Sequence, residues 1–120
     1  SARFGRIFVG RMLMMNSKIM DSGVDALFDA ILTLKNREEC YSFFEDLCTV
    51  QELKAMSQRY VVASMLREKK VYSDIVKVTG ASTATISRVN RSLTYGCDGY
   101  DMVFARLRDN EKNGADGEDK

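Results

Sequence analysis

The chain of 120 residues contains no histidine, no proline and no tryptophan. The absence of histidine removes the commonest general base and the commonest imidazole metal ligand. Without proline no helix interior is interrupted, and apolar side chains recur at helical spacing almost throughout the chain, which favours an all-α fold. We therefore expect a protein that is not an enzyme and that holds no metal and no cofactor.

Cysteine and long apolar runs are also scarce. The three cysteines, Cys40, Cys48 and Cys97, form no C-x-x-C pair, and an odd number cannot close a disulfide framework within one chain. Reduced thiols are typical of the cytoplasm. Because Arg11 interrupts the apolar residues near the start, we expect neither a membrane span nor a signal peptide. The sequence predicts a cytoplasmic protein.

The net charge of +1 conceals a strong asymmetry along the chain. Residues 1–20 carry four positive charges and no negative ones, and residues 21–53 carry two positive against eight negative. Residues 54–93 carry eight positive against two negative, and residues 94–120 four against seven. A basic block of forty residues inside an otherwise acidic fold attracts phosphate backbones, although a solvated helix face can give a similar count.

The domain limits follow from these patterns. Residues 1–20 are expected to be a flexible basic extension, which could be foreign to the natural protein because residue 1 is Ser and several Met follow. Residues 21–108 are expected to form the folded domain. Residues 109–120 have no apolar anchors, so we expect a disordered tail.

Three amphipathic helices are expected before residue 70. Asp21 or Ser22 can cap the first, Asn36 opens the second, and Thr49 with Glu52 forms a capping box for a long third helix. The large apolar side chains of these helices exceed what so small a domain can bury, which favours an interlocked pair of chains over a monomeric bundle. They are Phe28, Phe43, Phe44, Leu47, Met56 and Tyr60.

Residues 72–93 have the pattern of a helix-turn-helix. Ser73 is expected to cap a short helix, Gly80 supplies the left-handed turn, and Ser82 or Thr83 caps the next helix. Apolar side chains at Ile75, Ile86 and Val89 would face inward, as two steeply crossing helices require. A helix hairpin without any ligand remains the plainer alternative.

Helical geometry separates the residues of the second helix into two arcs. At about 100° per residue, Ile86, Val89 and Leu93 share one arc, and the opposite arc carries small polar residues and one arginine. Small side chains let a helix enter the major groove, where Ser, Thr and Arg can reach base edges or phosphates. The outer arc holds Thr83, Ala84, Ser87 and Arg91, and Lys77 of the preceding helix would add a phosphate contact.

The run Gly80-Ala81-Ser82-Thr83-Ala84-Thr85-Ile86-Ser87-Arg88, with Ser92-Leu93 behind it, resembles the Trp repressor superfamily. The Tyr95-Gly96 stretch is similar to its Trp-repressor-like YerC/YecD subgroup. The resemblance covers about residues 21–108 and implies an intertwined, all-α homodimer that binds double-stranded DNA at a two-fold symmetric operator, as a transcriptional regulator and repressor. It assigns DNA contacts to Thr83, Ala84, Thr85 and Ser87.

The resemblance also implies an effector pocket, formed by residues that match Thr49, Arg59, Arg88 and Ser92. Two arginines can sandwich an indole ring or hold a carboxylate. However, Val89 stands where the prototype has a glycine, and its branched side chain should crowd an indole. An amino-acid effector stays open, tryptophan is not expected, and Arg59 and Arg88 are expected to contact phosphate or carboxylate groups instead.

Two alternative functions stay open from the sequence. One is a DNA-binding accessory protein that needs no ligand. The other is a protein-protein interaction module that docks through the acidic helices between Asp21 and Asp46. A pull-down with and without nuclease would separate the second alternative from DNA binding.

Overall fold

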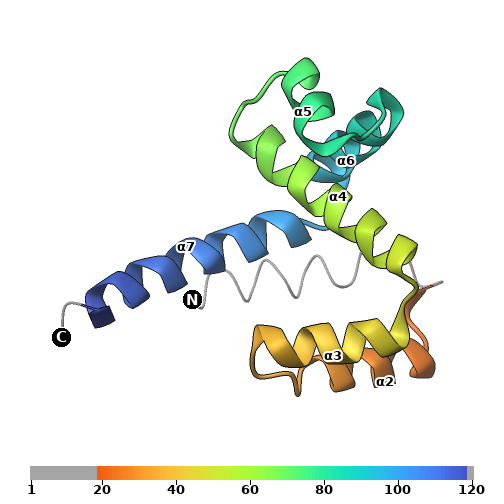
Figure 1. Ribbon diagram of the computed structural model, residues 1–120, viewed down its shortest axis with the longest axis vertical. Helices are drawn as coiled ribbons and strands as arrows, with labels where there is room; N and C mark the ends of the chain where they lie inside the picture. The colour runs from red at the N-terminus through yellow and green to blue at the C-terminus, as the bar shows by residue number, and fades with distance from the viewer. Residues whose placement is uncertain (1–18, 119–120) are drawn as a thin grey trace. The chain divides into compact units, whose positions relative to one another are not determined.

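A computed structural model describes the backbone of residues 19–118 and the side chains up to Gly114 (Figure 1). In this part of the chain every regular element is a helix, so the prediction of an all-α fold is confirmed. The expected basic extension lies outside the described residues, apart from residues 19 and 20. The helices are α2 (Ser22–Ile31), α3 (Arg37–Leu47), α4 (Val50–Arg67), α5 (Tyr72–Thr79), α6 (Thr83–Tyr95) and α7 (Gly99–Glu118). None of these helices combines the length and the apolar content needed to cross a membrane.

The chain divides into two compact units, the first ending at Met56 and the second beginning at Ser57, so the division falls within α4. Side-chain caps start the helices of the first unit. The N–H of Val24 donates to Oδ1 of Asp21 (2.7 Å) at α2, and the N–H of Glu39 donates to Oδ1 of Asn36 (2.9 Å) at α3. Each cap satisfies a backbone donor that has no partner inside the helix. Both helix starts were predicted from the sequence.

The capping box at the start of α4 is also present. The N–H of Thr49 donates to Oε1 of Glu52 (2.9 Å), and the N–H of Glu52 donates to Oγ1 of Thr49 (3.1 Å). Hydrogen bonds from the backbone N–H and from the side chain of Thr49 to the carboxylate lower the pKa of Glu52 below its ordinary value of 4.5, because they favour the ionised form. The box therefore depends on the charge state of Glu52.

The apolar stripes of the first unit are half-buried or exposed. Neither α2 nor α3 contains a buried residue. Leu32 is 81% exposed and Val50 69%, and Phe28, Tyr41 and Leu47 are also exposed. The sequence assigns the stripes of α2 and α3 to a core, whereas no residue of these two helices is fully buried.

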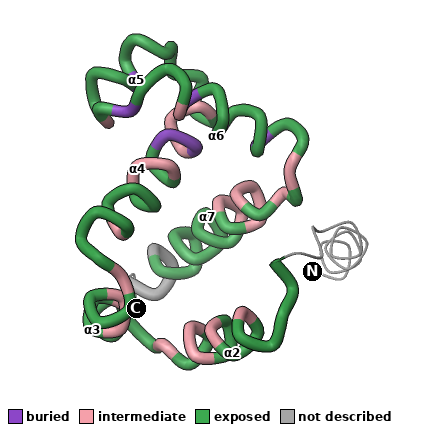
Figure 2. Tube along the Cα trace, turned by 90° about the vertical axis from the view of Figure 1, so that its right-hand side faces the viewer, coloured by how far each residue is buried: buried purple, intermediate pink, exposed green. Residues whose placement is uncertain are grey.

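The second unit has a core of its own, shown in purple in Figure 2. Residues from α4, α5 and α6 and from the turn between α5 and α6 form it: Val62, Ala63, Ile75, Ala81, Ile86, Val89 and Leu93. Tyr100 and Phe104 of α7 pack against this cluster. The prediction that Ile75, Ile86 and Val89 face inward is confirmed, and the helix-turn-helix is built on a buried apolar centre.

The helix α7 continues to Glu118, whereas the sequence predicts disorder from residue 109 onward. The tail contains no proline, and extending an existing helix costs much less than nucleating one. Opposite charges three residues apart, as at Asp109 and Lys112, favour the extension further. The prediction of disorder rested on the lack of apolar residues in the tail. It did not take into account that Phe104, earlier in α7, packs against the core of the second unit.

Candidate nucleic-acid interface

The turn between α5 and α6 depends on the backbone of Gly80. This residue has a φ of 72°, which is left-handed, and its N–H donates to the carbonyl oxygen of Val76 (2.8 Å). A Cβ built on Gly80 would meet no atom within 4 Å, so the requirement for glycine here is conformational and not steric. The Nε2 of Gln58 donates to the carbonyl oxygen of Thr79 (3.1 Å) and ties the turn to α4.

The structure corrects one predicted cap. The N-cap of α5 is Val71, which makes no side-chain capping bond, and Ser73 lies inside the first turn. Val71 has an extended backbone, which a β-branched residue adopts readily. Asp74 lies in the first turn, where the positive end of the helix dipole stabilises its carboxylate. The N-cap thus lies two residues before the serine that the sequence singled out.

The start of α6 agrees with the sequence. The Oγ of Ser82 accepts a hydrogen bond from the N–H of Thr85 (3.1 Å), which makes Ser82 the cap instead of Thr83. The hydroxyl of Ser82 also lies 3.1 Å from Oγ1 of Thr85, so the two side chains are linked. Ala81 is buried directly before the cap. The first turn of α6 is therefore held by a side-chain network and by the core.

The two arcs predicted for α6 are present. Ile86, Val89 and Leu93 are buried. Thr83, Ala84, Ser87, Arg88 and Arg91 are exposed on the same helix, and Lys77 is exposed on α5. Thr85 differs from the other predicted contacts because it is half-buried and linked to Ser82. The geometry leaves a small polar surface free to approach a groove, and the DNA contacts themselves stay predictions.

The last turn of α6 adds exposed residues that the sequence reasoning missed. Tyr95 is 83% exposed, and Asn90 and Thr94 are exposed as well. The rule of 100° per residue places Thr94 about 20° and Tyr95 about 120° from Thr83, so both fall near the outer arc. Continuing the same arithmetic to the end of the helix would have found them.

The cations of the basic block are mostly available to a ligand. Lys54, Lys69, Lys70, Lys77, Arg88 and Arg91 are exposed, and Arg59 is half-buried. Arg67 differs, because its guanidinium pairs with Asp101 at 2.8 Å. Lys69 and Lys70 lie where α4 ends, and their N–H groups donate to the carbonyl oxygens of Leu66 and Met65. This is a Schellman-type end, with Lys69 in the left-handed conformation at φ 65°.

The four residues that match the effector pocket are divided between the two units. Thr49 belongs to the first unit and takes part in the capping box, whereas the other three belong to the second unit. A hollow of about 530 Å³ beside the end of α6 is lined by Ser92 together with Tyr60, Tyr100 and Val103. Arg59 and Arg88 lie outside that lining. Val89 is only 2% exposed, so its side chain fills the core of the second unit.

Comparison with known proteins agrees with this geometry. A family model described as Trp repressor protein matches residues 22–108. The chain belongs to the Trp repressor family. This member is 51% identical over 98 residues to the "Uncharacterized protein YerC" of Bacillus subtilis (strain 168), a match that covers 82% of this chain and 94% of that protein.

Solved structures agree with the family assignment. The crystal structure of a TrpR-like protein from Eubacterium eligens ATCC 27750 is 61% identical, with a TM-score of 0.75, and the match covers 77% of this chain and 95% of the other. A crystal structure from Staphylococcus aureus also has a TM-score of 0.75 and is 54% identical, with 78% and 95% of the two chains covered. The resemblance to the Trp repressor family found in the sequence is thus confirmed, and membership supports a DNA-binding regulator.

Proposed function

We propose that this Trp repressor family member is a cytoplasmic transcriptional regulator, acting as a repressor, that reads a double-stranded operator with α6. One observation carries the proposal: α6 buries one arc in a core and presents a small, polar, exposed arc directly after a rigid turn. An N-terminal first turn of this kind is the part of a reading helix that meets base edges. The side chains of Thr83, Ala84 and Ser87 are small enough to let the backbone of α6 approach the base edges.

The roles of the side chains follow from their chemistry. The hydroxyls of Thr83 and Ser87 can donate to or accept from bases or phosphates, and the methyl of Ala84 can meet a thymine methyl. Arg91 can reach a guanine or a phosphate. Lys77 and Arg88 carry charge beside this arc and suit phosphate contacts, which supply affinity without sequence preference. We assign Thr85 to the same surface, although its hydroxyl already accepts a hydrogen bond from the hydroxyl of Ser82.

The open apolar stripes of the first unit support a homodimer. Burying one large apolar side chain contributes about 1.5–3 kcal/mol, so leaving Phe28, Leu32 and Val50 in water is costly for a lone chain. A second copy presents the same stripes and can cover them. A two-fold dimer carries two copies of α6, and the operator should then contain two half-sites about 34 Å apart, which is one turn of DNA.

We propose further that DNA binding does not require tryptophan. Two contacts support this: Val89 is packed into the core of the second unit, and Oγ1 of Thr49 accepts the N–H of Glu52. An amino-acid effector of another kind stays open. Calorimetry of the purified protein with tryptophan, other amino acids and indoles tests the proposal, which fails if tryptophan binds and raises affinity for DNA.

A selection experiment tests the main proposal. The purified full chain is incubated with duplexes containing a random central segment, and the retained DNA is sequenced over several rounds. We expect a two-fold symmetric motif, together with a dimer in analytical ultracentrifugation. The proposal of a sequence-specific regulator is rejected if the protein retains no duplex in dilute buffer, or if it retains DNA without enriching any sequence.

A further inference from the structure

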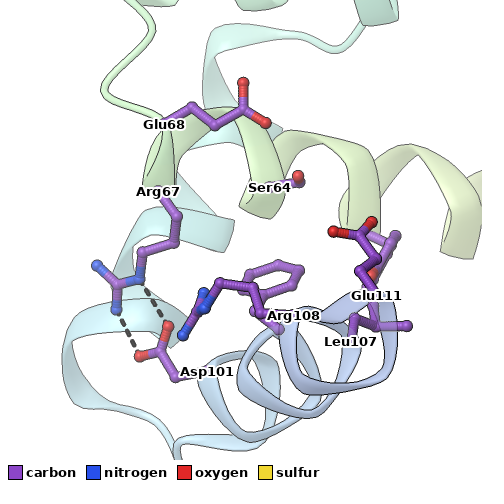
Figure 3. Close-up of a pocket in the computed structure, with 9 residues that line it drawn as sticks. Ser64, Arg67, Glu68, Asp101, Leu107, Arg108 and Glu111 are labelled. Atoms are coloured by element: carbon purple, nitrogen blue, oxygen red, sulfur yellow. Dashed lines mark hydrogen bonds and ion pairs between the residues drawn. The ribbon is translucent and has the colours of Figure 1, made fainter. Parts of the chain in front are cut away.

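One guanidinium joins three helices of the second unit. The Nε of Arg67, at the end of α4, donates to Oδ1 of Asp101 (2.8 Å), and its Nη2 donates to Oδ2 of the same carboxylate (2.8 Å). Nη2 also donates to the carbonyl oxygen of Leu93 in α6 (3.2 Å). Figure 3 shows the side chains of Arg67 and Asp101 pointing toward each other. We call this three-way contact the Arg67 clamp.

The clamp suits the electrostatics of the helix ends that it joins. Leu93 lies in the last turn of α6, where carbonyl oxygens lack partners within the helix and carry the negative end of the dipole. Asp101 lies in the first turn of α7, where the positive end of the dipole favours a carboxylate. The hydrogen bonding of the Arg67 guanidinium to the carboxylate of Asp101 raises the pKa of Arg67. The bidentate fork fixes the orientation of both side chains, which a single point contact would not do.

The connection between α6 and α7 is short and constrained as well. The N–H of Gly96 donates to the carbonyl oxygen of Ser92 (2.9 Å), and a Cβ on Gly96 would lie 2.3 Å from that oxygen. Asp98 follows with a φ of 62°. The end of α6 is thus held by a tight turn on one side and by the Arg67 clamp on the other.

The clamp lies at the end of α6, and the predicted base contacts of Thr83, Ala84 and Ser87 lie toward its start. Helix α6 has 13 residues, so at 1.5 Å per residue its two ends are about 18 Å apart. A tilt of about 10° displaces one end relative to the other by about 3 Å over this length. A hydrogen bond to a base edge requires donor and acceptor within about 3.2 Å. Small changes in helix angle therefore decide which contacts to DNA can form.

We propose that Arg67 and Asp101 are positioning residues that set the angle of α6 and thereby the sequence preference of the protein. The inference rests on the proposed function, because it assigns a role in reading DNA to residues that do not touch it. The pair is partly open to water, with side-chain exposures of 41% and 42%. Exposed ion pairs contribute little to stability, so variants of the clamp should remain folded.

The test compares variants of the full chain that differ in the clamp but have matched changes of charge. Arg67→Gln removes the fork, Asp101→Asn weakens its acceptor, and the double variant removes the ion pair without changing net charge. Arg106→Gln is the control, because it removes one exposed cation from α7 and leaves the clamp intact. Each protein is titrated with the duplex that the wild type selects and with a scrambled duplex of equal composition, at several salt concentrations.

We expect the ratio of the two affinities to fall about tenfold in the clamp variants and to stay at the wild-type value in Arg106→Gln. The salt dependence for the scrambled duplex should be alike in Arg67→Gln and Arg106→Gln, since each loses one cation. Arg67→Lys keeps the charge but cannot form the fork, so its ratio should fall as well. If Arg67→Gln fails to fold, the milder Asp101→Asn decides the question.

Two results overturn the inference, and they are distinguishable. A wild-type chain that selects no sequence removes the proposed function and the inference together. A wild-type chain that selects a sequence, with clamp variants whose ratios equal that of Arg106→Gln, removes the inference alone and leaves Arg67 with a structural role.

Discussion

The two glycines that flank α6 should respond very differently to alanine, although both lie in tight turns. At Gly80 an added Cβ meets nothing within 4 Å, so only the left-handed backbone, at φ 72°, opposes the substitution. That conformation costs a residue with a Cβ about 1–2 kcal/mol, and the lower entropy of the unfolded chain with alanine offsets about 0.4–1 kcal/mol of this cost. The expected net loss for Gly80→Ala is about 1 kcal/mol.

At Gly96 the obstacle is steric. The Cβ would lie 2.3 Å from the carbonyl oxygen of Ser92, which is backbone and cannot rotate away. The end of α6 or the start of α7 would have to shift, and overpacking that moves the backbone costs up to about 3 kcal/mol, occasionally more. Because a domain of this size has a total stability of about 5–15 kcal/mol, Gly96→Ala should remove a large share of it.

Urea unfolding of the two variants and the wild type, followed by circular dichroism at equal protein concentration, measures both losses. Equal concentrations matter because the stability of a dimer depends on concentration. The reasoning is refuted if Gly80→Ala costs as much as Gly96→Ala, or if Gly96→Ala costs less than about 1 kcal/mol, the value expected for Gly80→Ala.

Three further predictions concern charge and helix ends. Arg91→Ala should weaken binding to the selected operator by about 1–3 kcal/mol if Arg91 contacts a base. Lys77→Ala should weaken binding to all duplexes alike and flatten the salt dependence of the affinity. Titrations at several salt concentrations measure both effects, and equal, salt-independent losses of affinity would contradict both roles. Lys69→Gly should raise the free energy of unfolding by up to about 1 kcal/mol, because Lys69 has a φ of 65°, and an unchanged urea midpoint would count against the strain. Because the pKa of Glu52 is lowered in the folded state, its contribution to stability is present above pH 4.5 and is lost as the pH falls through the lowered pKa. Glu52→Gln still accepts the hydrogen bond but does not titrate, so the free energy of unfolding should fall less steeply at acid pH, the acid limb of the stability curve. Parallel acid limbs in wild type and variant would show that the box does not depend on this charge.

Local signals in the sequence predicted much of the second unit and the starts of α2, α3 and α4 in the first. The caps at Asp21 and Asn36, the capping box at Thr49 and the turn at Gly80 each depend on a few neighbouring residues. The inner arc of α6 follows from periodicity alone. Such features can be read without knowing the fold, because their physical causes act within about one helical turn.

The features that the sequence did not predict have distant causes. Arg67 and Asp101 are 34 residues apart, and no spacing rule connects them. The helical tail depends on the anchor that Phe104 provides to α7. At α5 two residues competed for the cap, and the extended preference of Val71 prevailed over the hydroxyl of Ser73. In each case tertiary packing or backbone preference decided between options that were locally plausible.

The distribution of buried residues separates the two tasks of the molecule. The helix-turn-helix has its own buried centre, so the polar arc of α6 is presented by a structure that one chain completes. Helices α2 and α3 contain no fully buried residue, and in the proposed dimer a second copy would cover their apolar stripes. Pairing of chains and reading of DNA should therefore depend on different sets of residues, with Leu32 and Phe28 governing the first and Thr83 and Ser87 the second. In the proposed dimer two linked helices would read a symmetric site, so loss of pairing should weaken operator binding far more than binding to unrelated DNA, even with every residue of α6 intact.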